Sequence, residues 1–308
     1  MSRPHVVTSS ELQSLRDLEL MTKTTVEGLR QGLHRSPFHG YSAEFSQYRH
    51  YRPGDDLKYV DWKAFARTDR IYTRQFRETT NVSALFVIDV SRSMDFPFDS
   101  TTSARGSRFA QGKPQTKFDM ARSVAAILGT LVLDQGDAAG VLAVDERTRL
   151  VPPRSGHHHL RVMLAELASL TPRGSVPIAE VLRRAAALLK RRGLVVVISD
   201  FYDDEDSLAQ IRRLARMGHD VIAIHTIARE EQTLDVGGAA EFVDLESGRT
   251  LMVQPSAARE AYMAAFAKWL AEVEQQVRRD GIDYLRLVTG EPLDAALRRF
   301  LVGRRGAS

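Results

Sequence analysis

Residues 83–93, SALFVIDVSRS, decide the fold, because a short apolar run ends there in a group of polar side chains. The run 84–88 has the length and composition of a buried β-strand. Similar runs recur at 138–144, 194–198, 221–227 and 282–288, and segments of helical length and spacing lie between them at 118–133, 158–170, 178–191 and 207–217. Apolar strands that alternate with helices are typical of a parallel sheet covered on both faces. The sequence therefore predicts a doubly wound, mostly parallel α/β sheet of Rossmann type.

The residues before this α/β pattern differ from it in composition and spacing. Residues 10–33 have leucines at helical spacing and predict one or two opening helices. Residues 34–81 are rich in aromatic and charged residues around turn signals, with an alternating strand at 70–77. We therefore predict an N-terminal module of helix and short strands over residues 1–81 and an α/β domain over residues 82–308.

The predicted α/β domain departs from simple alternation in two places. Residues 96–116, rich in Ser, Thr, Gly and Arg, separate the first strand from its helix and predict an exposed insertion. Residues 241–253 have the pattern of a hairpin around a Ser-Gly turn, and residues 256–280 that of a long helix with one apolar stripe. The domain is thus expected to end in a hairpin followed by helices.

Length and composition exclude several classes of protein. The chain has 308 residues, of which 43% are hydrophobic and 27% are charged, as is ordinary for a folded globular protein. It has no cysteine, so disulfides, thiolate zinc sites, iron–sulfur clusters and cysteine nucleophiles are excluded. Neither an apolar signal segment nor a stretch of roughly 20 apolar residues is present. We therefore expect a cytoplasmic protein without direct membrane insertion.

Polar side chains follow two of the predicted strands at their carboxyl ends. Asp89, Ser91 and Ser93 form an Asp-x-Ser-x-Ser pattern after the first strand, and Asp200 follows the strand at 194–198. Ligands of open α/β sheets bind at this edge, so we expect these side chains to meet. Oxygen ligands of this kind suit Mg²⁺ or Mn²⁺, with some coordination positions left to water. Either motif alone fits a turn or a helix cap, but the pair favours a cation site.

The same residues resemble the metal-ion-dependent adhesion site of von Willebrand factor A domains. The upstream segments 51–56 (YRPGDD), 60–63 (VDWK) and 66–68 (ART) further resemble a bacterial family of such domains, domain of unknown function fifty-eight. This resemblance runs from about residue 34 to residue 301. It implies a von Willebrand factor A-like fold, and members of the family are commonly encoded beside MoxR-type AAA+ ATPases.

The resemblance also implies a role for each residue of the pattern. Ser91 and Ser93 would bind the cation directly, whereas Asp89 and Asp200 would act mostly through water. An acidic residue of a partner protein would fill the last coordination position. The site is thus expected to attract a carboxylate from another protein.

One ligand of von Willebrand A domains does not carry over. Those domains complete the set with a threonine from a middle loop, and alignment by the helix at 178–191 puts Val176 at that position. Ser175 could substitute if the loop shifts by one residue. Ser175 is therefore the remaining candidate ligand.

The sequence favours a non-enzymatic protein-interaction module. No histidine, lysine or other base is placed by the sequence beside the oxygen cluster, which argues for adhesion rather than hydrolysis. The resemblance implies that the partner is a MoxR-type AAA+ ATPase in chaperone-like assembly or maturation, together with a client protein that exposes an Asp or Glu. A metal-dependent phosphohydrolase with Asp89 as nucleophile is a weaker alternative, because Ser91 stands where a second aspartate is needed.

The N-terminal module offers a second route to a partner. Residues 48–77 hold eight Lys or Arg residues interleaved with aromatic residues, which could bind nucleic acid. Four aspartates intervene, however, and arginine and aromatic residues are also enriched in protein interfaces. We therefore expect no nucleic acid, and keep metal-independent docking of a protein as the alternative. The residues proposed to carry it are Arg52, Asp55, Asp56, Asp61 and Trp62.

Overall fold

The computed structural model divides the chain into two compact units, one of Met1–Pro37 and Ser83–Ser308 and one of Phe38–Val82. The residues that it describes are 9–30, 43–53, 55–56, 59–78, 82–96, 116–145, 147–173, 176–202, 205–234, 240–243, 249–253 and 255–305. The predicted insertion near 96–116 lies outside the described residues over 97–115.

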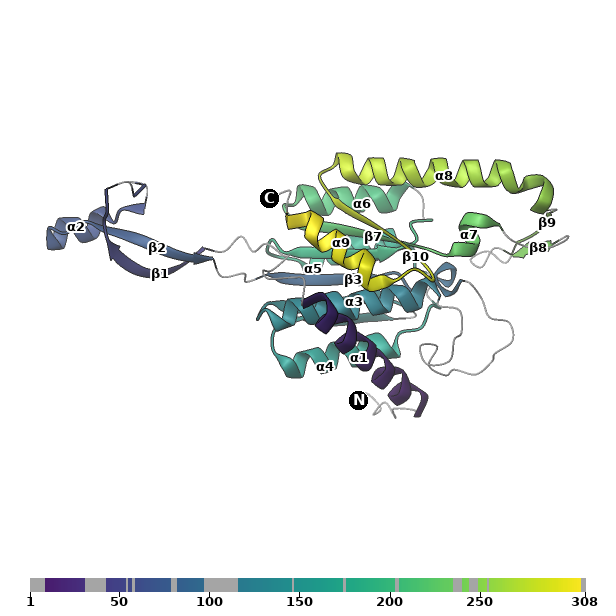
Figure 1. Cartoon of the computed structure of the whole chain (residues 1–308), viewed down its shortest axis with the longest axis horizontal. Helices are drawn as coiled ribbons and strands as arrows, with labels where there is room; N and C mark the ends of the chain where they lie inside the picture. Colours follow the sequence, from purple (N-terminus) through teal and green to yellow (C-terminus); the bar gives the residue numbers. More distant parts are fainter. Residues whose placement is uncertain are drawn as a thin grey trace. The chain divides into compact units, whose positions relative to one another are not determined.

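A six-stranded sheet forms the centre of the larger unit (Figure 1), in the order β10-β7-β6-β3-β4-β5. Neighbouring strands are parallel except for β4 and β5, which are antiparallel. The strands are β3 (Ser83–Ile88), β4 (Ala138–Val144), β5 (Thr148–Arg154), β6 (Leu194–Ser199), β7 (Asp220–Ile227) and β10 (Asp283–Val288). The predicted mostly parallel α/β sheet is therefore confirmed.

Helices cover both faces of this sheet. Successive side chains of a strand point to opposite faces, so the apolar strands need helices on both sides to bury them. Leu85 and Val87 of β3 belong to a core cluster with α5 (Ile178–Leu188), α6 (Glu205–Arg216) and α8 (Pro255–Arg279). Phe86, between them, lies against α3 (Lys117–Asp134) on the other face. Helices α1 (Ser9–Arg30) and α4 (His157–Ser169) pack on α3, and α9 (Leu293–Arg305) packs on β10.

The opening helix does not belong to the short-strand module, in contrast to the predicted division at residue 81. α1 is a single helix that contacts α3, α4 and α9, and Leu18, Val26 and Leu29 on it are buried. These side chains gain a core only by packing on the α/β unit. The structure therefore places the first boundary after Pro37, and the return to the α/β unit at Ser83.

The smaller unit is an antiparallel ribbon with one helix. β1 (Ala43–His50) pairs with β2 (Tyr72–Glu78), and α2 (Trp62–Thr68) lies between them in sequence. The backbone N–H groups of Lys63 and Ala64 donate to the Asp61 carboxylate, which caps the start of α2. The aspartate of the VDWK segment therefore has a structural role.

The C-terminal hairpin and long helix are present as predicted. β8 (Ala240–Val243) pairs antiparallel with β9 (Thr250–Val253), and α8 follows. Two short helices were not predicted, the 3-10 helix η2 (Arg92–Asp95) after β3 and α7 (Arg229–Thr233) after β7. None of the helices in the described part of the chain has the length and apolar character needed to cross a bilayer.

Strand β5 escaped prediction because Pro152 and Pro153 lie within it. Proline donates no hydrogen bond to a ladder, so such a strand is tolerated at the edge of a sheet, and β5 is the edge strand. It approaches β4 closely at Gly140, where an added Cβ would lie 2.4 Å from the carbonyl oxygen of Val151. Only glycine fits at that position.

Candidate functional site

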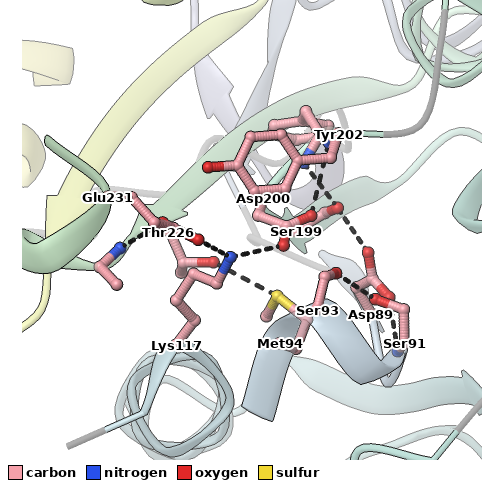
Figure 2. Close-up of polar contacts among 12 residues, drawn as sticks. Asp89, Ser91, Ser93, Met94, Lys117, Ser199, Asp200, Tyr202, Thr226 and Glu231 are labelled. Atoms are coloured by element: carbon pink, nitrogen blue, oxygen red, sulfur yellow. Dashed lines mark hydrogen bonds and ion pairs between the residues drawn. The ribbon is translucent and has the colours of Figure 1, made fainter. Parts of the chain in front are cut away.

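Four of the predicted site residues, Asp89, Ser91, Ser93 and Asp200, follow the carboxyl ends of β3 and β6, which pair as parallel neighbours. Within the sheet, β4 lies next to β3 on one side, and β6 lies next to β3 on the other side, followed by β7. The strand order therefore reverses between β3 and β6, and open α/β sheets bind their ligands at such a point. Figure 2 shows the side chains gathered there, with Asp89 and Asp200 following the two strands.

Asp89 is held in place by hydrogen bonds to both carboxylate oxygens. The backbone N–H of Ser91 donates to its Oδ1 at 2.9 Å, and the Ser199 hydroxyl donates to its Oδ2 at 2.6 Å. Asp89 is only 5% exposed. Burial, together with the neighbouring Asp200 carboxylate, raises the pKa of Asp89 to about 6. Both oxygens of the Asp89 carboxylate are thus fixed by groups of the protein.

The two serines of the motif converge. Their Oγ atoms lie 3.0 Å apart, and both residues are half-buried (Figure 2). The 3-10 helix η2 begins directly after Ser91 and turns the chain, so Ser91 and Ser93 face one another. Two neutral oxygen atoms therefore lie side by side next to the Asp89 carboxylate.

A buried lysine completes the group. The Lys117 ammonium Nζ lies 2.8 Å from Asp200 Oδ2 and 2.5 Å from Glu231 Oε1, and the Lys117 side chain is 0% exposed. The same ammonium lies 4.7 Å from the centre of the Tyr202 ring. Burial lowers the pKa of Lys117, but the carboxylates of Asp200 and Glu231 outweigh it and raise the pKa above its ordinary value. Lys117 is therefore protonated at neutral pH and cannot serve as a base.

Sequence reasoning missed Lys117 and Glu231, although each carries a signal. Lys117 is the first residue of α3, where the helix dipole disfavours a cation, so a buried lysine there needs carboxylate partners. Glu231 lies in α7, directly after β7, which is the next strand beyond β6. Its carboxylate also accepts a hydrogen bond from the Ala228 backbone N–H at 2.8 Å. The edge rule that located Asp200 applies equally to Glu231.

The third hydroxyl ligand is not provided by residue 176. Val176 is half-buried and packs against the hydrophobic cluster formed by the sheet with α5, α6 and α8. Ser175, the remaining candidate, lies outside the described residues. Among the described residues, the candidate oxygen ligands of a cation are therefore Ser91, Ser93 and the neighbouring carboxylates.

The composition of this group fits a small divalent cation. Asp89, Asp200 and Glu231 supply three carboxylates against the single ammonium of Lys117, so the buried cluster has an excess of negative charge. A cation offsets such an excess, and hydroxyl and carboxylate oxygens are the ligands that Mg²⁺ and Mn²⁺ prefer. In the described part of the chain, no three His, Asp or Glu side chains by themselves form a metal-binding group. The serine hydroxyls would have to contribute.

Comparisons with known proteins identify the family. The sequence profile described as "Protein of unknown function DUF58" matches residues 47–272. The uncharacterised protein Rv1480 of Mycobacterium tuberculosis is 31% identical over 302 residues, covering 95% of this chain and 89% of that protein. YeaD of Bacillus subtilis is 25% identical over 179 residues, which cover 57% of this chain and 39% of YeaD.

Two solved structures are similar to this chain at low sequence identity. The conserved hypothetical protein BatB from Bacteroides thetaiotaomicron is 17% identical, with a TM-score of 0.45, and the match covers 73% of this chain and 99% of BatB. An aerotolerance-related membrane protein from Bacteroides fragilis is 15% identical, with a TM-score of 0.44, and the match covers 74% of this chain and 100% of that chain. From its profile match and its mycobacterial relative, the chain belongs to the DUF58 family of proteins of unknown function.

Proposed function

We propose that the chain is a non-enzymatic protein-interaction module that presents a divalent cation to an acidic residue of a partner. Ser91 and Ser93 would hold Mg²⁺ or Mn²⁺ directly, and Asp89 and Asp200 would set its charge and geometry. When bound, the cation supplies an open coordination position that attracts an Asp or Glu side chain. This assignment corresponds to the metal-ion-dependent adhesion site of a von Willebrand factor A-like domain.

The convergence of the two serine hydroxyls, 3.0 Å apart beside a buried aspartate, carries this proposal. Hydroxyl ligands bring no charge, so a cation held by them keeps much of its positive character and favours a carboxylate from outside. The resemblance of the chain to proteins encoded beside MoxR-type AAA+ ATPases supports such an ATPase as the partner, with a client protein that exposes an Asp or Glu.

The state of the neighbouring groups favours binding over catalysis. Lys117 stays protonated between two carboxylates, so it cannot remove a proton from a water molecule or a substrate. Both oxygens of Asp89 accept hydrogen bonds within the protein, which makes it a poor nucleophile for a phosphohydrolase. A cation at this site would thus bind a partner rather than activate a nucleophile.

Asp89→Ala is expected to abolish saturable Mn²⁺ binding, measured by electron paramagnetic resonance on the purified protein, because it removes the buried charge behind the two serines. The matched control is Asp145→Ala, since Asp145 follows the neighbouring strand β4 but pairs with Arg149. The same two variants are then tested for binding to the MoxR-type ATPase with and without a chelator. Unchanged binding of Mn²⁺ and of the ATPase by Asp89→Ala would contradict the proposal.

A second candidate function is metal-independent docking through the smaller unit. Trp62 is 57% exposed and Tyr48 is 51% exposed, which is unusual for large aromatic residues. Asp55 accepts hydrogen bonds from Arg49 and from the backbone N–H of Arg52, and Asp61 caps α2, so these acids act within the unit. The exposed aromatic rings are therefore better candidates for contact than the aspartates.

Trp62→Ala separates this second candidate from the first. Because Trp62 is mostly exposed and its ring meets Phe65 edge-on within the same short helix, the substitution is expected to leave the circular dichroism spectrum and the melting temperature nearly unchanged. Loss of ATPase binding in this variant, together with insensitivity of the wild-type interaction to chelator, would support metal-independent docking. Retained binding by Trp62→Ala would contradict it.

A further inference from the structure

We propose that Lys117 acts as a resident cation of this site, which competes with the divalent ion for the carboxylate of Asp200. The inference rests on the cation site of the proposed function and adds a residue that sets the affinity of that site. Its basis is the direct contact of the Lys117 ammonium with Asp200 at 2.8 Å, on the same carboxylate that the cation would need.

Lys117 is fixed in this position by its surroundings. It begins α3, whose first turn is closed by mutual hydrogen bonds between Thr116 and Asp119. The Lys117 side chain is 0% exposed, and the ring of Tyr202 lies over its ammonium group. The ammonium group therefore cannot turn out into solvent when a second cation approaches.

The Asp200 carboxylate would interact with both Lys117 and the divalent ion. Its Oδ2 accepts from Lys117, and the backbone N–H of Tyr202 donates to its Oδ1 at 3.4 Å. A divalent ion near Ser91 and Ser93 would attract the Asp200 carboxylate and repel the Lys117 ammonium. The ion pair with Glu231 would then contribute more to holding the ammonium in place. Two positive groups on one buried carboxylate oppose each other, so Lys117 weakens the binding of the ion. A partner that adds its own carboxylate would offset this opposition.

The competition can be separated from a simple effect of net charge. In the wild type, three carboxylates and one ammonium give the cluster a formal charge of −2. The double variant K117M/E231Q removes one charge of each sign, so its two remaining aspartates also give −2. The wild type and the double variant therefore match in formal charge and differ in whether Asp200 has a resident cation.

The test is Mn²⁺ titration, followed by electron paramagnetic resonance, of the wild type, K117M/E231Q, Glu231→Gln and Asp89→Ala. K117M/E231Q is expected to bind Mn²⁺ about tenfold or more tightly than the wild type, because Asp200 is released from Lys117. Glu231→Gln is expected to bind more weakly than the wild type, because the ammonium is then left with Asp200 alone. A second double variant, K117Q/E231Q, carries the same formal charge with a polar side chain and has the same expected result.

The outcomes distinguish this inference from the proposed function. Equal Mn²⁺ affinity in the wild type and both double variants, lost in Asp89→Ala, would overturn the role of Lys117 and leave the cation site standing. Absence of binding in all of them would overturn both. Binding in the double variants with little or none in the wild type would support both, with Lys117 as the group that limits occupancy. Circular dichroism of each variant verifies that the compared proteins are folded.

Discussion

Replacing Lys117 by methionine is expected to lower the free energy of unfolding by about 3–5 kcal/mol, the usual cost of removing one partner from a buried ion pair. The substitution leaves Asp200, which is 2% exposed, and the mostly buried Glu231 without the cation between them. Methionine fills a similar volume, so packing contributes little to the loss. The expected cost is therefore electrostatic.

Urea unfolding followed by circular dichroism measures this loss, and a second substitution identifies its cause. Glu231→Gln introduced into Lys117→Met removes one stranded carboxylate and is expected to restore part of the lost stability. Arg122→Met provides the matched background, because Arg122 is a buried cation of the same helix that pairs with Asp119 instead. Equal effects of Glu231→Gln in the two backgrounds would show that Lys117 and Glu231 are not energetically coupled.

The residues of the proposed cation site differ in how far the sequence alone could locate them. Asp89 and Asp200 were predictable because each follows an apolar strand, and the edge rule then brings them together. Lys117 was missed, because the sequence between Ser93 and Lys117 has no periodic pattern that would place the lysine at this edge of the sheet. Glu231 also follows an apolar strand, so the edge rule could have located it, but its helix of five residues is too short to produce a detectable apolar period.

A second large effect is expected from pH, through His225 on β7. This histidine is fully buried, its Nδ1 lies 2.8 Å from the Tyr284 hydroxyl, and its ring packs edge-on against Trp269 and Phe201. Burial lowers the pKa of His225 from 6.5 to about 4. Between these pH values the unfolded chain binds a proton that the folded chain does not. The stability from neutral His225 is therefore complete above pH 6.5 and is lost as the pH falls toward 4, by about 3 kcal/mol.

The His225→Phe variant isolates this contribution. Phenylalanine keeps an aromatic ring among the neighbours of His225 but cannot titrate, so it removes the proton linkage at the cost of one hydrogen bond to Tyr284. Free energies of unfolding are measured from pH 7 to pH 4 for both proteins. The wild type is expected to lose about 3 kcal/mol more than the variant over this range. Parallel pH profiles would contradict a depressed pKa of His225.

The fold was predictable where burial dictates the sequence and less so elsewhere. β4 was predicted over the residues that it occupies, because both faces of a central strand are covered and the run is continuously apolar. The ribbon strand β1 has polar and aromatic residues without a continuous apolar run, so only its partner β2 was predicted. The place of α1 depended on which surface its apolar stripe meets, and a stripe alone does not specify its partner.

The two prolines of β5 have a consequence for self-association. An edge strand normally offers a row of unpaired backbone groups that another chain can extend. Pro152 and Pro153 have no N–H, and because the N–H groups of consecutive strand residues point to opposite sides, one of the two prolines removes a donor from the outer edge that a foreign strand would need. The same strand pairs with β4 on its inner side and ends the sheet on its outer side. A proline at this border thus disfavours the addition of a strand from another chain.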